Sequence, residues 1–228
     1  MITRIVKNNV ELFEYVLMGL LGFIILFTGI TTFGSFSNFA AGNIGRMLWF
    51  IIYIGLIGIL LYCIAANKTD YTKFLAKAYL AYYAISTMLS VSGPFYAYYE
   101  DNTALRVAEA VFMMLAIFAF IALVVIGVII KIKGAKLEFV FDILALCYLA
   151  LEVLVWILAL CVDAKAKTGW AAAMNEFTDH LLIPCSVVLG YYLYQIKFVN
   201  TPQDEAYVAF NVEDTVEDKP VKTTKKKK

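Results

Sequence analysis

The sequence has few of the residues from which active sites are usually built. Only one of its 228 residues, His180, is a histidine, so one chain cannot supply the two ligands of a bis-histidine haem. The four cysteines form no CxxC pair and lie in or beside apolar runs, which is typical of small buried residues. No Gly-rich phosphate loop, GxSxG or HExxH motif occurs. We therefore predict no metal, no cofactor and no enzymatic activity.

Charged residues are also scarce. They make up 16% of the chain, whereas 62% of the residues are apolar and the mean hydropathy is +0.78. Soluble domains are about 45–50% apolar, and here the excess lies in runs long enough to cross a bilayer. We predict an all-α, polytopic integral membrane protein with six transmembrane helices, whose partner is the lipid bilayer and not a nucleic acid. The expected spans are 12–33, 47–66, 74–98, 107–130, 137–162 and 179–198.

The remaining segments suggest an orientation. Residues 1–11 form a short polar lead, 164–178 a loop, and 200–228 a disordered tail with blocks of charge. If the N-terminus is cytoplasmic, most of the 19 Lys and Arg residues fall on the cytoplasmic side. The positive-inside rule then places both termini in the cytoplasm. We expect the plasma membrane, or the endoplasmic reticulum of a eukaryote, because four terminal lysines also fit a dilysine retrieval signal.

The fifth span carries acids inside an apolar helix. Glu138, Asp142, Glu152 and Trp156 are spaced to lie roughly along one stripe. An ionised carboxylate near mid-bilayer costs about 2.5–3.5 kcal/mol or more. Either other helices cover this stripe or its carboxyl groups are protonated.

The sequence offers a candidate side-chain partner for each of the acids Asp142 and Glu152. Lys77 of the third span lies at a depth compatible with Asp142, so the two are expected to pair, unless Lys77 extends its ammonium to the interface. Glu152 lies deeper, without a basic residue at its own depth. It is either protonated or hydrogen-bonded to a Tyr or Ser of the third or sixth span. Such a group serves as a proton or cation site, or as a neutral link between helices.

Two spans contain helix-breaking prolines. Pro94 lies in the last part of the polar third span, and Pro184 lies one turn into the sixth, so a kink or break is expected at each. In transporters, interrupted helices often mark a binding cavity. The fourth span is nearly free of polar residues and is the best candidate for a lipid-facing helix.

These features favour a small-solute or ion transporter, or the membrane subunit of one. The alternative is a non-catalytic assembly protein whose acidic stripe docks a helix of another membrane subunit; an intramembrane enzyme is a third reading. Glu109, Asp179 and His180, near the outer span ends, either form a metal-linked or proton-linked gate or are hydrated there. The predicted solute or cation site consists of Asp142, Glu152, Lys77, Tyr83, Ser86 and Ser90, with Pro94 and Pro184 as structural kinks.

Overall fold

The computed structural model of this chain describes residues 2–34, 44–89, 103–129, 135–166 and 170–199. Within these residues every regular element is a helix, as predicted. The helices are α1 (Ile2–Asn8), α2 (Val10–Gly34), α3 (Ile44–Ala65), α4 (Thr69–Leu89), α6 (Ala104–Ile129), α7 (Ala135–Ala166), α8 (Trp170–Phe177), η3 (Thr178–Leu182), α9 (Ile183–Tyr194) and η4 (Gln195–Val199).

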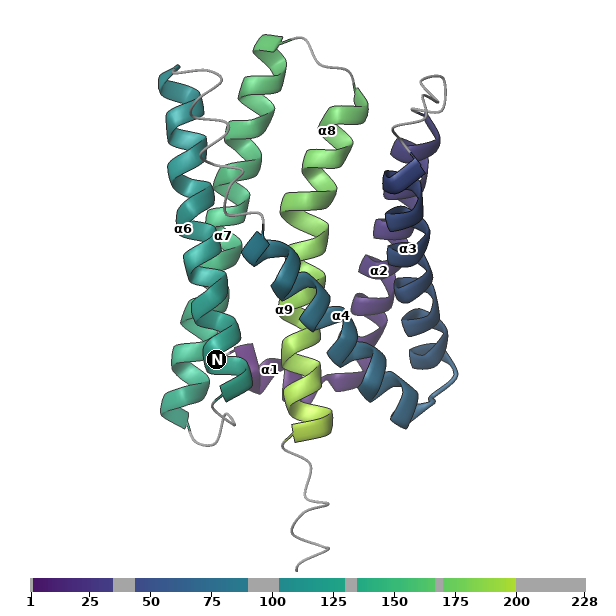
Figure 1. Cartoon of the computed structure of the whole chain (residues 1–228). Helices are drawn as coiled ribbons and strands as arrows, with labels where there is room; N and C mark the ends of the chain where they lie inside the picture. The colour runs from purple at the N-terminus through teal and green to yellow at the C-terminus, as the bar shows by residue number, and fades with distance from the viewer. Residues whose placement is uncertain (1, 35–43, 90–102, 130–134, 167–169, 200–228) are drawn as a thin grey trace, which may run out of the picture.

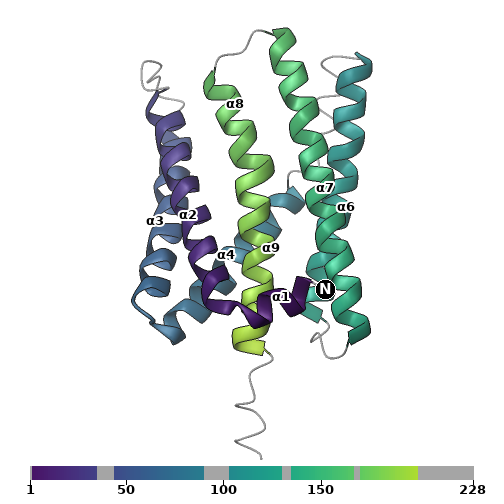
Figure 2. The same ribbon diagram turned by 180° about the vertical axis from the view of Figure 1, so that it is seen from behind.

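The last four elements form one continuous helical rod at the centre of the bundle. Helices α2 and α3 pair on one side of this central rod, and α6 and α7 pair on the other (Figure 1). Helix α4 crosses one face of the central rod obliquely, whereas α1 lies across the opposite face near one end (Figure 2). The central rod therefore contacts both helix pairs, and its side chains are placed to join them.

The helices suit a membrane. In the described residues, four stretches are long and apolar enough to cross a bilayer: Val10–Thr31, Ala104–Ile126, Leu137–Val162 and Ala173–Val199. The described apolar stretch of α3, Ile51–Ala65, is shorter. These lengths and compositions fit a multi-pass membrane protein.

The count of six crossings stays a prediction, because α4 is long enough for a span but not apolar enough, and the described apolar stretch of α3 is short. It is the most polar of the long helices, and it crosses the bundle at an angle (Figure 1). The expected third span continued to residue 98, and its last part, with Ser90 and Pro94, lies outside the described residues.

The outer surface is apolar, as lipid contact requires. Large exposed side chains on the flanks include Phe23, Ile52, Phe118 and Leu154. Helix α6 is not the most lipid-facing helix, however, and that prediction is wrong. A larger share of its apolar window is buried than in α2, because α6 packs along α7. Hydropathy alone does not distinguish packing against lipid from packing against another apolar helix.

The polar lead is also more structured than expected. Residues 2–8 form helix α1, with Val6 only 1% exposed. At the same end of the bundle, Lys197 of η4 forms an ion pair with Glu14 of α2. The two described ends of the chain therefore lie at one end of the bundle (Figure 1), which agrees with an even number of crossings.

A tight turn joins α3 to α4. Asn67 has a left-handed backbone (φ 51°), a conformation that Asn tolerates better than most residues. The amide of Lys68 donates to the carbonyl of Cys63 (3.0 Å), and the amide of Asn67 donates to that of Ile64 (3.1 Å). These are the two hydrogen bonds of a Schellman cap. The cap ends α3 and allows α4 to leave in a new direction.

Candidate functional site

The acids of α7 face the other helices of the same chain. Asp142 is 3% exposed, and the side chain of Glu152 is 12% exposed. Buried Ala145 and Tyr148 lie between them on the same face of α7. The expectation that sister helices cover this stripe is therefore confirmed, and the two acids lie about 15 Å apart along the helix.

Asp142 holds three elements together at the end of the bundle where α1 lies. Its Oδ1 accepts hydrogen bonds from the amide (3.1 Å) and hydroxyl (2.7 Å) of Thr3, and from the hydroxyl of Tyr192 (2.8 Å). Lys77 is exposed on α4, and among the described residues no ion pair joins it to Asp142. The expected Lys77–Asp142 pair is not formed, because α1 and α9 supply the donors instead.

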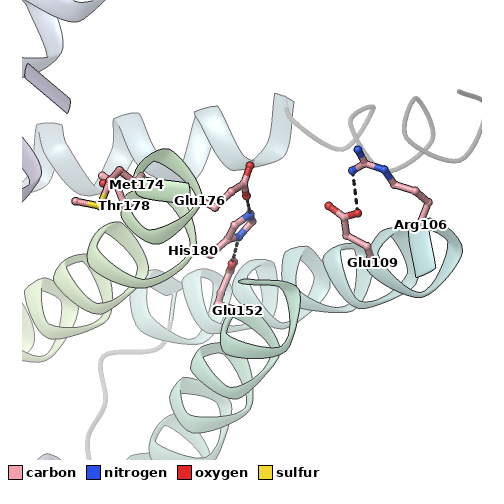
Figure 3. Close-up of polar contacts among 7 residues, drawn as sticks. All are labelled: Arg106, Glu109, Glu152, Met174, Glu176, Thr178 and His180. Carbon is pink, nitrogen blue, oxygen red and sulfur yellow. Dashed lines mark hydrogen bonds and ion pairs between the residues drawn. The ribbon is translucent and has the colours of Figure 1, made fainter. Parts of the chain in front are cut away.

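Glu152 contacts the only histidine of the chain. Nδ1 of His180 lies 2.8 Å from a Glu152 carboxylate oxygen, and Nε2 lies 3.3 Å from a Glu176 oxygen (Figure 3). These three residues, which we call the Glu–His–Glu cluster, join α7 to the central rod. The side chains of His180 and Glu176 are 16% and 32% exposed, so the cluster is partly enclosed. The sequence hypothesis named Tyr or Ser as the partner of Glu152, and it missed His180.

A widened helical turn positions His180. The residue lies in η3, where the amide of Ile183 donates to the carbonyl of Thr178, five residues earlier. Pro184 follows directly and has no N–H to continue an ordinary α-helical pattern. The hydroxyl of Thr178 donates to the carbonyl of Met174 (2.9 Å; Figure 3). Single π-helical turns of this kind often occur at functional sites.

The cluster is suited to holding a proton. An ionised carboxylate only accepts hydrogen bonds, whereas a protonated imidazole donates from both nitrogens. A protonated His180 between two ionised glutamates satisfies both contacts and leaves one net negative charge. One further proton makes the cluster neutral. Within the described part of the chain, no group of three or more His, Cys, Asp or Glu side chains has the arrangement of a metal site.

Glu109 and Asp179, which are also near this end, have other surroundings than His180. Glu109 of α6 is 5% exposed and forms an ion pair with Arg106 (3.0 Å; Figure 3). Asp179 is exposed. The predicted gate therefore does not form as one group, because its three residues have different surroundings. Of Glu109, Asp179 and His180, only His180 belongs to the cluster.

Hydroxyl groups continue from the cluster into the core. The hydroxyl oxygen of Tyr148, one turn before Glu152, lies 3.0 Å from the hydroxyl oxygen of Tyr83 on α4. The ring of Phe120 packs against the rings of both tyrosines. The hydroxyl of Tyr79 lies 2.8 Å from that of Ser186. Of the residues predicted on α4, Tyr83 therefore reaches the inner face of α7.

The remaining predicted site residues do not join this arrangement. Ser86 is exposed on α4. Pro184 is buried in the central rod directly after the π-helical turn. Ser90 and Pro94 lie outside the described residues.

The fold and the cluster together define a multi-pass membrane protein with an ionisable site between its helices. Comparison with protein-family models, with curated proteins and with solved structures gives no match.

Proposed function

We propose that this protein is a proton-linked transporter of a small solute or ion, or the membrane subunit of one. We propose further that it crosses the plasma membrane six times with both termini in the cytoplasm. The endoplasmic reticulum is the alternative location if the organism is eukaryotic. It acts by binding and moving its substrate, not by catalysing a covalent reaction.

The observation that carries this proposal is the contact of His180 with two carboxylates, that of Glu176 on the same helical rod and that of Glu152 on α7. Ionisable side chains inside a membrane helix are costly, and they commonly mark ion pathways or proton relays. Glu152 comes from α7, whereas His180 and Glu176 lie on the central rod, so the proton content of the cluster changes the attraction between α7 and the central rod. This provides a physical link between proton binding and helix position.

The other polar residues take supporting roles. Tyr148 and Tyr83 form a hydroxyl-bearing wall beside Glu152. We place Asp142 outside this site, in a seal at the end of the bundle where α1 lies, because donors of α1 and α9 occupy its oxygen. The π-helical turn before Pro184 is the position at which the central rod adjusts to the charge of the cluster.

The alternative was an assembly protein whose acidic stripe docks a partner helix. That stripe is used within the chain: Asp142 contacts α1 and α9, and Glu152 contacts His180. A partner helix would have to displace these contacts. This favours the transporter proposal over docking through the acids of α7.

Proton movement across proteoliposomes tests the proposal. The full-length protein is reconstituted with a trapped pH-sensitive dye, and gradients of amino acids, sugars, monocarboxylates, amines and inorganic cations are applied one at a time. We expect at least one solute to drive proton movement in the wild-type protein. Glu152→Gln should reduce that movement at least about tenfold, because an amide cannot exchange the proton.

Glu138→Gln is the matched control. It makes the same chemical change near the start of the same helix, outside the cluster, and should leave the proton movement unchanged. Folding of each variant is checked by circular dichroism and gel filtration. Proton movement that survives in folded Glu152→Gln, or a folded wild-type protein that moves protons with none of the solutes, would refute the proposal.

A further inference from the structure

A groove opens on the outside of the bundle between α4, α6 and the C-terminal part of the central rod. Its volume is about 570 Å³ and its lining is mostly apolar. This size lies in the range of about 300–1,000 Å³ found for ligand pockets. The lining includes Lys77, Ala81, Ile85, Met88, Val124 and Tyr194.

Lys77 is the single charged residue in the lining of this groove. It is exposed, and within the described part of the chain no carboxylate pairs with it. One cation in an otherwise apolar groove matches a ligand with an anionic head and a hydrocarbon tail. A small hydrophilic anion would leave most of the lining without a suitable contact.

The direction of the groove fits a lipid of the surrounding leaflet. Helix α4 begins at the end of the bundle where α1 and η4 lie and rises obliquely towards its middle (Figure 1). Lys77 therefore lies nearer that end than Met88, which follows about 16 Å further along the helix. A head group at Lys77 lies towards the interface, and the tail points towards the bilayer centre.

We propose that this groove binds an anionic phospholipid, with the phosphate against the ammonium of Lys77 and an acyl chain along α4 towards Met88. The lipid fills the space between the oblique α4 and the two neighbouring elements, and so links α4 to the bundle. Lysine near a membrane surface attracts anionic lipid in this way. The site is separate from the Glu–His–Glu cluster and does not depend on the transport proposal.

Native mass spectrometry of the full-length protein in detergent tests this site. Phosphatidylglycerol is titrated in comparison with phosphatidylcholine of the same acyl chains. We expect tighter binding of phosphatidylglycerol, and Lys77→Met should weaken it about fivefold, as expected for the loss of one lysine near the head group. Lys73→Met, which removes the same charge one turn earlier on α4 and outside the groove lining, should change the affinity less than twofold.

A second pair of variants tests the tail. Ala81→Phe fills the groove without changing charge and should weaken binding of both lipids, whereas Ala65→Phe, outside the groove, should not. Equal affinity of the wild-type protein for the two lipids would overturn the proposal, as would unchanged phosphatidylglycerol binding in both Lys77→Met and Ala81→Phe. Displacement of the lipid by millimolar inorganic phosphate would also overturn it, because it would indicate a site for free phosphate.

Discussion

At Asp142, one carboxylate oxygen accepts hydrogen bonds from three donors on two other helices. Thr3 and Tyr192 are buried, so neither has water as a ready substitute partner. Leaving a buried donor without an acceptor costs about 1–3 kcal/mol. This single side chain therefore fixes α1 against both α7 and α9.

Asp142→Ala should lower the free energy of unfolding by about 2–4 kcal/mol, because it leaves several buried donors unsatisfied. Asp142→Asn retains an acceptor oxygen, and its cost should be nearer 1 kcal/mol. Unfolding of the purified protein by a denaturing detergent, followed by circular dichroism, measures both. Glu138→Gln on the same helix should stay within about 0.5 kcal/mol of the wild type. Equal stability of Asp142→Ala and the wild type would contradict this role.

The sequence indicates which acids of α7 face the other helices, but it does not indicate which side chains contact those acids. The cost of a charge in hydrocarbon is large, so the direction of Asp142 and Glu152 follows from their positions in an apolar helix. Their partners do not follow, because Thr3 lies in a segment that resembles an ordinary polar lead. The position of His180 at the end of a predicted span is also typical of a residue hydrated at the membrane interface. The spacing of Glu176 and His180, four apart on one helix, was the one available signal.

At the scale of elements, the central rod differs most from expectation. Residues 164–178 were predicted as a loop, yet α8 begins at Trp170 and continues through η3 into α9. The tertiary contacts explain this difference: Phe177 packs edge-on against both Phe27 of α2 and Trp156 of α7. Packing of this kind adds to the high helix propensity of an alanine-rich segment, which the expectation of a loop did not take into account.

Pro184→Ala tests whether the widened turn positions His180. Alanine restores an N–H that can bond to the carbonyl of His180, four residues earlier, so η3 can tighten into an α-helix. We expect unchanged or higher thermal stability, together with a loss of solute-driven proton movement similar to that of Glu152→Gln. Melting temperature and proteoliposome flux are measured on the same preparation. Flux at the wild-type level would mean that the π-helical turn is not needed for the site.

At the scale of the whole molecule, the central rod lies between two helix pairs and both described chain ends lie at one end of the bundle (Figure 1). The general class, several long apolar helices in a membrane, follows from hydropathy. The oblique course of α4 does not follow from hydropathy. Its tyrosines and its short turn from α3 are visible in the sequence, but its direction depends on how α6 and α9 pack against it.

Reporter fusions test the proposed orientation. A fluorescent protein fused to either terminus should be bright, and alkaline phosphatase at those positions inactive, if both ends are cytoplasmic. Alkaline phosphatase inserted after Ala166, at the opposite end of α7, should be active. Active phosphatase at both termini would reverse the proposed orientation, and opposite results at the two termini would contradict an even number of crossings.

Thiol cross-linking in native membranes tests the arrangement of α7 most directly. In a variant without the four native cysteines, the pairs Glu152→Cys with His180→Cys and Thr3→Cys with Asp142→Cys are treated with a short bifunctional methanethiosulfonate. We predict efficient intramolecular cross-linking in both pairs, and little in the control pair Lys77→Cys with Asp142→Cys. Failure of the first two pairs, or efficient reaction of the control, would show that the acids of α7 do not meet the helices described here.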